Sequence, residues 1–260
     1  MIKFDERKWL KDVIENRNQQ AITNNKYLVK YLIKYYYPQF KNKTAVEFKE
    51  FIINEMNLFH FDNARYEEWE LADYIDRLCK RALKGEFNVY LRELEYVDIT
   101  QAEMDIIEQA QTNNHKKLLF TLYVLAKLYP YRSGWVNFRD SEIFKLANIH
   151  LNFRERHFLV NDLYTQGLLG LNHIIGKVSY KVNLVEDSPA VCRVSREDHF
   201  GNQYLLYVKN HEWTMCEKCG RLIKKHSPNQ KYCQKCAQII QKNQIKQWKR
   251  ENSENERKPA

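Results

Sequence analysis

Two Cys-x-x-Cys pairs near the C-terminus limit what this chain can fold into more than any other feature of its sequence. The pairs consist of Cys216, Cys219, Cys233 and Cys236. A two-residue gap lets both thiolates of a pair reach one metal ion, and two pairs complete the tetrahedral sulfur shell that zinc prefers. The segment between the pairs, residues 220–232, has room for a short hairpin. The sequence therefore predicts one structural Zn²⁺ per chain, bound by four cysteines.

The alternative for these cysteines is a pair of disulfide bonds in a secreted protein. Disulfides persist in oxidising compartments, and Met1 leads into a charged segment without the apolar stretch of a signal peptide. We therefore expect a reduced, cytoplasmic protein. The apolar runs of the chain are far shorter than a bilayer span, so no membrane partner is expected. Cys79 and Cys192 stand alone, and we expect both to be buried small residues.

The residues around the cysteines predict the shape of the metal module. Gly220 follows the first pair, where a tight turn often needs a residue that adopts positive φ. Residues 234–250 contain no Gly or Pro and predict a helix, which would begin at the second pair. In its ligand pairs, the segment 216–251 resembles GATA-type and related treble-clef zinc fingers, although its loop is shorter than is usual for GATA fingers. The resemblance implies a treble-clef finger that binds DNA, RNA or protein, and residues 252–260 are expected to be disordered.

Charge is distributed unevenly along the 260 residues, whose formal net charge is +9. Residues 1–114 are net −3, residues 115–185 net +6, residues 186–215 net −2 and residues 216–260 net +8. Zinc bound to four thiolates is formally −2, so the occupied tail would be nearer +6. Basic surface on a compact module favours a polyanion, most often nucleic acid, with solubility alone as the alternative. Two basic modules in one chain favour the nucleic-acid partner.

The N-terminal part, residues 1–98, is predicted to be a helical domain. Apolar residues recur at three- and four-residue spacing over segments 5–16, 25–37, 44–57 and 64–84. Pro38 is expected to end the second helix, and Gly85 follows the fourth. The second helix carries a tyrosine stripe and a lysine stripe, which could stack bases and hold phosphates. The net negative charge of this domain disfavours nucleic-acid binding. It favours a partly buried tyrosine stripe and contact with another protein.

Residues 99–185 predict a second domain. Thr100 and Glu103 form a capping-box pattern at the start of a helix. The elements expected after it are a helix over 116–129, an extended piece over 135–138, a brief helix capped by Asp140 or Ser141, a helix over 152–166, and hairpin strands over 168–175 and 178–185. Gly176 and Lys177 would form a type II′ turn between the two strands. This is the order of a winged helix-turn-helix domain.

The segment from about Thr100 to Val185 resembles winged-helix domains of uncharacterised proteins in phages and mobile elements of Gram-positive bacteria. The stretches that carry the resemblance are residues 117–122, 142–148 and 162–168. The resemblance implies a winged helix and, through that fold, a DNA-binding role. With the finger, the chain resembles uncharacterised winged-helix plus treble-clef zinc-finger proteins of these elements.

The helix over 152–166 would supply base contacts. A recognition helix reads bases with its N-terminal residues, where arginine pairs with guanine and asparagine with adenine. The candidate DNA contacts on this helix are Asn152, Arg154, Arg156 and His157. The alternative for them is ordinary solvated surface. The residues expected to pack inward are Phe153, Val160, Leu163 and Tyr164, with help from Phe158 or Leu159.

Further lysine and arginine residues are candidates for phosphate contacts. Lys177 and Lys181 lie on the hairpin. The tail helix carries Lys242, Lys246, Lys249 and Arg250 on one side. A helix with one basic face can contact successive phosphates of a nucleic acid. The alternative is that these residues only make the helix soluble. Residues 186–215 are expected to form a β connector, with strands over 191–194 and 204–208.

Catalysis is not expected. Nucleases of the His-Asn-His type also carry zinc-bearing treble clefs, but they need an Asp-His or His-His pair on the hairpin and a histidine on the helix. Here the hairpin carries only His226, and Asp198-His199 precedes the first cysteine pair. Four sulfur ligands also leave no open position on zinc.

We therefore expect a mainly α, non-enzymatic protein that binds double-stranded DNA. The expected use is transcription regulation by a phage or mobile element in the cytoplasm of a bacterial host, with replication initiation or takeover of the host as alternatives. The alternative is a protein-interaction module that binds a host nucleic-acid enzyme, such as RNA polymerase, and inhibits or redirects it. The oligomeric state stays open.

Overall fold

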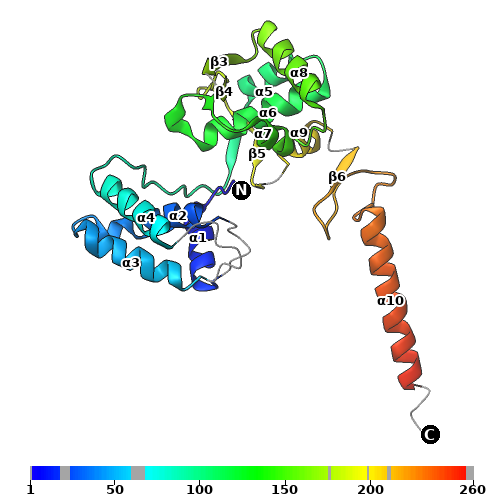
Figure 1. Ribbon diagram of the computed structural model, residues 1–260. Coiled ribbons are helices and arrows are strands. Elements are labelled where there is room, and N and C mark those ends of the chain that lie inside the picture. Colours follow the sequence, from blue (N-terminus) through cyan, green and yellow to red (C-terminus); the bar gives the residue numbers. More distant parts are fainter. Residues whose placement is uncertain are drawn as a thin grey trace. The chain divides into compact units, whose positions relative to one another are not determined.

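The computed structural model describes residues 2–17, 24–59, 68–174, 177–197, 199–209 and 212–255. These residues are mainly helical, with three small antiparallel sheets. This confirms the mainly α class that the sequence predicts. The chain divides into two compact units, Met1–Tyr96 and Val97–Ala260 (Figure 1).

The first unit is built from helices packed around one apolar core. They are α1 (Glu6–Glu15), α2 (Asn25–Phe40), α3 (Ala45–Asn57) and α4 (Glu68–Leu83). Cys79 is buried in this core, as expected, beside Leu32, Phe48 and Ile52. The segment after α4 returns to α1, where the buried Arg92 guanidinium lies 2.6 Å from the Glu6 carboxylate. This ion pair ties the two ends of the unit together.

Helix α2 continues through Pro38, so the prediction that this proline ends the helix is wrong. Pro38 stands in the last turn, where it removes only the hydrogen bond to the Lys34 carbonyl. Phe40 stacks on Phe48 of α3 with ring centroids 4.8 Å apart, and it packs at the same distance against Phe51. These contacts hold the last turn in place, because packing of an apolar face contributes more than that one hydrogen bond.

The tyrosine stripe of α2 is partly buried at Tyr31 and Tyr35, as the sequence predicts, while Tyr27 is exposed. Tyr31 and Tyr35 pack against the core. Lys34 donates from Nζ to the Tyr90 carbonyl at 3.1 Å, and burial lowers the pKa of its ammonium. The stripe is therefore part of the packing of this unit.

The second unit surrounds helix α6. Its elements are β1 (Val97–Thr100), α5 (Gln101–Glu108), α6 (Asn113–Leu128), the 3-10 helix η2 (Pro130–Arg132), β2 (Trp135–Val136), α7 (Asp140–Leu146), α8 (Phe153–Thr165), β3 (Gly170–Ile174), β4 (Lys177–Lys181), β5 (Ala190–Val194), α9 (Phe200–Val208), β6 (Trp213–Met215), β7 (Leu222–Lys224) and α10 (Gln234–Asn255). Helix α6 contacts α5, α7, α8, α9, β1 and β2. Nearly all of its apolar side chains are buried.

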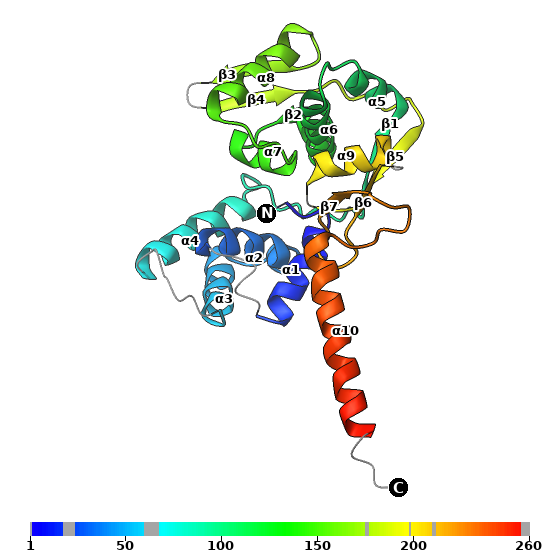
Figure 2. The same ribbon diagram turned by 90° about the vertical axis from the view of Figure 1, so that its right-hand side faces the viewer.

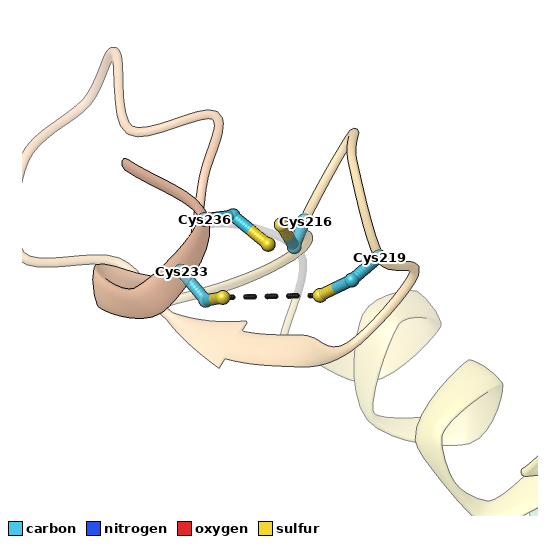
Figure 3. Close-up of side chains that lie close together, drawn as sticks. All are labelled: Cys216, Cys219, Cys233 and Cys236. Atoms are coloured by element: carbon cyan, nitrogen blue, oxygen red, sulfur yellow. Dashed lines mark hydrogen bonds between the residues drawn. The ribbon is translucent and has the colours of Figure 1, made fainter. Parts of the chain in front are cut away.

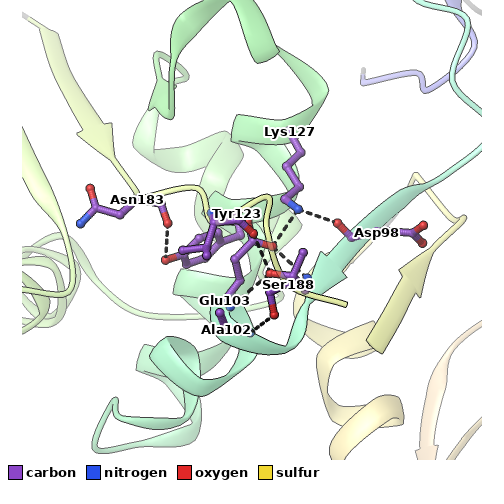
Figure 4. A network of polar contacts seen from close by, with 9 residues as sticks. Asp98, Ala102, Glu103, Tyr123, Lys127, Asn183 and Ser188 are labelled. Atoms are coloured by element: carbon purple, nitrogen blue, oxygen red, sulfur yellow. Dashed lines mark hydrogen bonds and ion pairs between the residues drawn. The ribbon is translucent and has the colours of Figure 1, made fainter. Parts of the chain in front are cut away.

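The capping box predicted at Thr100 is present and belongs to a larger polar network (Figure 4). The Glu103 carboxylate is fully buried and accepts from the backbone N–H groups of Thr100 at 2.9 Å and Val185 at 3.2 Å. Lys127 of α6 lies 2.7 Å from the same carboxylate. One buried side chain thus joins α5, α6, β1 and the segment after β4.

The three-stranded sheet has the order β2-β4-β3, with all pairs antiparallel. Lys177 pairs with Ile174 and is a strand residue, so its assignment to the turn is wrong. The two residues between the strands are 175 and 176, and the predicted type II′ turn lies outside the described residues.

Residues 186–215 form the expected β connector only in part, since the predicted strand over 191–194 is present as β5 and the second predicted strand is not. Strand β5 pairs with β1, with Val194 opposite Val97, and carries the buried Cys192. The predicted strand over 204–208 is instead part of helix α9. A short apolar run does not distinguish a strand from a buried helix, and packing against α6 decides for the helix. Tyr204 is buried with its ring 5.7 Å from that of Phe120.

Helix α9 also lies directly against the turn between α7 and α8. A Cβ atom placed on Gly201 would stand 2.1 Å from the Ala147 carbonyl oxygen, so a larger residue cannot occupy this position without a shift of backbone. Next to it, the amide of Asn148 donates to the Asn202 side-chain oxygen at 2.8 Å. The start of α9 is therefore part of the core that holds the α7–α8 turn.

Candidate metal centre and nucleic-acid interface

The first cysteine pair lies in a tight turn between strands β6 and β7, which pair antiparallel. The Gly220 N–H donates to the Cys216 carbonyl at 2.8 Å, and the Cys216 N–H donates to the Arg221 carbonyl at 2.8 Å. Gly220 has φ +67°, the left-handed conformation that the sequence predicts for it. This backbone conformation turns both thiols of the pair to the same side.

The second pair stands where helix α10 begins. Cys233 directly precedes α10, Cys236 lies in its first turn, and the Ala237 N–H donates to the Cys233 carbonyl at 2.9 Å. The Glu217 N–H donates to the Lys231 carbonyl at 3.0 Å and joins the turn of the first pair to the segment before the helix. The two pairs therefore meet, although residues 220–232 separate them.

The four sulfur atoms converge on one point (Figure 3). They all lie within 4.8 Å of one another, and the Cys219 and Cys233 sulfurs are 3.8 Å apart. Zn–S bonds of about 2.3 Å in a tetrahedron place sulfurs about 3.8 Å from one another, whereas a disulfide requires about 2.05 Å. All six cysteines of the described residues are free thiols. The cluster can hold a metal ion, and its chemistry fits zinc.

Hydrogen bonds and burial act in opposite directions on these thiols. Burial disfavours the Cys216 thiolate, but backbone N–H groups of Cys233, Cys219 and Lys218 donate to it and lower its pKa to about 6. The backbone N–H of Cys236 similarly lowers the pKa of Cys233. Burial raises the pKa of Cys236 to about 12, together with its neighbouring thiols. A bound cation would favour the deprotonated form of all four thiols.

Three of the four cysteines are buried, and Cys219 is exposed. Ile223 and Tyr232 pack against the buried sulfurs. Four protein ligands fill a tetrahedral shell, so a zinc ion here would have no open coordination position.

The candidate DNA contacts on α8 have different surroundings. Asn152 caps the helix, because its Oδ1 accepts from the Glu155 N–H at 3.0 Å while the Glu155 carboxylate accepts from the Asn152 N–H at 2.8 Å. This oxygen is engaged, and bidentate recognition of adenine would require it. Arg154 is exposed, and His157 stands edge-on to the Phe153 ring with centroids 4.3 Å apart.

Arg156 is held against the turn before α8. Its Nε donates to the Leu151 carbonyl at 2.9 Å, and its guanidinium lies 5.2 Å from the centre of the Phe144 ring. The same turn receives the buried Lys117 ammonium, which donates to the Asn148 carbonyl at 2.6 Å; burial lowers the pKa of this lysine. The sequence gives no signal that distinguishes Lys117 from Lys116 and Lys127 on the same helix.

The inward packing predicted for α8 is correct for Leu159, Val160 and Leu163, which are buried. It is wrong for Phe153 and Tyr164, which are exposed, and of the two alternatives Leu159 is buried while Phe158 is exposed. At about 100° per residue, Phe153 and Tyr164 lie next to the buried Val160, whereas Phe158 lies on another side of the helix. Periodicity alone therefore does not separate the exposed aromatic residues from the buried ones.

The remaining basic candidates lie on two other elements. Lys181 is exposed on β4, with Nζ 5.6 Å from the centre of the Trp135 ring. Lys242 and Lys246 are exposed on α10, which runs away from the β6–β7 hairpin (Figure 2). The backbone of Lys177 lies in β4 and those of Lys249 and Arg250 in α10, while their side chains lie outside the described part of the chain. Helix α10 extends to Asn255, so the expectation of disorder after residue 251 is wrong for residues 252–255.

Comparisons with protein-family models, curated proteins and solved structures found no match to this chain. Among the described residues, no helix has both the length and the apolar character needed to cross a bilayer.

Proposed function

We propose that this protein is a non-enzymatic DNA-binding protein whose residues 99–185 form a winged helix. The observation that carries the proposal is the order α6, β2, α7, α8, β3, β4, closed by the sheet β2-β4-β3. In this arrangement α8 takes the place of a recognition helix and the β3–β4 hairpin that of a wing. Arg154 and His157 in the first turns of α8 are exposed, where such a helix meets base edges.

The four-cysteine module would act as a treble-clef finger with a structural zinc ion. Its helix α10 carries no acidic residue between Gln234 and Arg250, so its charge is complementary to phosphate. In this proposal α8 reads bases while the wing lysines and α10 contribute phosphate contacts. A regulator of transcription in a phage or mobile element, acting in the bacterial cytoplasm, is the use that agrees best with the resemblance of the sequence.

The test is binding of the full-length, zinc-loaded protein to random duplex DNA at several salt concentrations, followed by selection of preferred sites. We expect log affinity to fall linearly with log salt, because bound lysines release counterions from DNA. We also expect a selected site that binds at least about 10³ times more tightly than random duplex. Failure to bind any duplex at low salt would reject the proposal.

A second function has one specific observation in its favour. Ile245 and Trp248 of α10 are exposed apolar residues on a different side of the helix from Lys242 and Lys246. Such residues suit a protein surface better than a phosphate backbone. In this alternative the chain binds a host nucleic-acid enzyme such as RNA polymerase. Binding to purified RNA polymerase that disappears in Trp248→Ala, with DNA affinity unchanged, would favour it.

A further inference from the structure

Helix α8 presents large apolar rings to solvent at its N-terminal end. Phe153 is 73% exposed and Phe158 is 68% exposed. The same helix buries Leu159, Val160 and Leu163 in the core, while the two phenylalanine rings stay largely in solvent. Exposed rings clustered on one element mark a contact surface.

The two rings flank Arg154. Phe153 is the first residue of α8, and Phe158 follows Arg154 by four residues, the spacing of neighbours on one side of a helix. The Phe153 ring is held edge-on by His157 at 4.3 Å. These residues occupy the first two turns of α8, the part of a recognition helix that reaches base edges. Tyr164, the third exposed aromatic residue, lies in the last turn.

Exposed charges of both signs, Arg154 and Glu155, lie near these rings. The carboxylate of Glu155 is engaged in the helix cap, where it accepts from the Asn152 N–H. Asp162 faces His115 of α6, with 3.5 Å between its carboxylate and the imidazole. Arg154 is the exposed guanidinium beside the two phenylalanines. A surface that combines one guanidinium with two apolar rings suits a negatively charged partner that carries small apolar groups.

The major groove of duplex DNA has this chemistry. Arginine pairs there with guanine O6 and N7, and the thymine C5-methyl is the apolar group that a base pair presents to a phenylalanine. We propose that Phe153 and Phe158 contact thymine methyl groups, and that they make the protein selective for sites with thymine beside a guanine read by Arg154. This inference rests on the proposed function, in which α8 enters the major groove.

Replacement of thymine by uracil in the bound site tests the inference, because uracil keeps the pairing with adenine and lacks only the methyl group. The site is first selected from random duplexes with the full-length protein, then synthesised in thymine and uracil forms. We expect the uracil duplex to bind about fourfold more weakly for each methyl group that the phenylalanines touch, which corresponds to about 0.8 kcal/mol. Phe158→Ala should lower affinity for the thymine form and reduce the difference between the two forms.

Tyr164→Ala is the matched control, since it removes an exposed aromatic residue of the same helix outside the first two turns. We expect this variant to keep the full preference for thymine. Both replaced side chains are exposed, so unfolding midpoints should stay unchanged. Equal binding of both duplexes by the unmodified protein would overturn the inference and leave the proposed function standing, whereas absence of any selected duplex would reject both. If Phe158→Ala instead dissociates an oligomer and keeps the thymine preference, the rings belong to a contact between two copies, which also overturns the inference.

Discussion

Three sulfurs of the four-cysteine cluster, those of Cys216, Cys233 and Cys236, have different surroundings. Cys216 and Cys233 accept backbone hydrogen bonds that stabilise their thiolates, while burial opposes ionisation of Cys236. Removal of any one ligand leaves three sulfurs, which cannot complete the shell of a structural zinc site.

We predict that Cys236→Ser abolishes stoichiometric zinc binding, because it removes a buried ligand at the start of α10. Elemental analysis should find about one zinc per chain in the unmodified protein and far less in the variant. Cys79→Ala is the matched control, since Cys79 is also buried but lies in the core of the first unit. A variant at Cys236 that retains a full equivalent of zinc would contradict the four-cysteine site.

The two arginines at the start of α8 should act differently. Arg154 is exposed, so Arg154→Ala should cost about 1–3 kcal/mol on the preferred site and much less on random DNA. Arg156 donates to the Leu151 carbonyl and lies over the Phe144 ring. Arg156→Ala should therefore lower the unfolding midpoint as well as the affinity for DNA. Paired titrations on the selected and random duplexes, with a melting curve for each variant, separate the two effects. If Arg154→Ala lowers the affinity for both duplexes equally, Arg154 contacts phosphate and not a base. Arg154→Lys is the control, because lysine keeps the positive charge and lacks the planar guanidinium.

At the scale of the element, the second unit depends on a buried ion pair. Glu103 is fully buried and lies 2.7 Å from Lys127, and two further backbone donors use the same carboxylate. Removal of one partner from a buried pair typically costs about 3–5 kcal/mol, because the remaining charge loses its compensation.

We predict that Glu103→Gln destabilises the second unit by that amount, measured by urea unfolding followed by circular dichroism. Arg193→Gln provides the comparison. It breaks an exposed pair with Asp98 on the β1–β5 sheet, where the guanidinium lies 2.9 Å from the carboxylate. Exposed pairs contribute about 0–1 kcal/mol. Similar unfolding midpoints for the two variants would show that the Glu103 network is not a main source of stability.

Helix α10 should affect DNA binding through charge rather than sequence. The double variant Lys242→Ala/Lys246→Ala should weaken binding to all duplexes alike and reduce the salt slope by about 0.9 for each phosphate that is no longer neutralised. Lys41→Ala/Lys43→Ala removes the same charge from exposed lysines of the first unit and should leave the slope nearly unchanged. An unchanged slope in the α10 variant would make protein docking the better explanation for this helix.

At the scale of the whole molecule, metal removal should have a local effect. Zinc-finger peptides gain about 10–16 kcal/mol from metal near neutral pH, and the finger has little apolar core besides Ile223 and Tyr232. The helical unit and the residues around α6 have extensive cores of their own. A strong chelator should therefore unfold the finger while both cores stay folded.

Hydrogen exchange followed by mass spectrometry checks this prediction, with zinc re-addition as the control for reversibility. Amides in residues 213–240 should lose protection in chelator, and those of α2 and α6 should keep it. Loss of protection throughout the second unit would mean that the metal site also supports the packing around α6.

The sequence by itself determined the features that depend on local spacing. The Cys-x-x-Cys pairs, the positive φ at Gly220 and the Thr100 capping box each involve residues within a few positions, so their geometry follows from chain connectivity. The amphipathic pattern similarly predicted the positions of most helices, because the apolar face of a helix must be buried against other elements. Boundaries such as the start of α6 at Asn113 were less accurate, since Thr112 caps the helix earlier than its apolar pattern begins.

Only the tertiary structure decided the features that depend on distant partners. Residues 204–208 are helical because the Tyr204 ring packs near the Phe120 ring of α6. Helix α2 continues past Pro38 because the Phe40 ring stacks on the Phe48 ring of α3. The exposure of Phe153 and Phe158 was also decided there, since it depends on which side of α8 meets α6 and the rest of the core. Side chains distant in sequence determine these outcomes, and their burial free energy exceeds the small local preferences that a pattern of neighbouring residues reports.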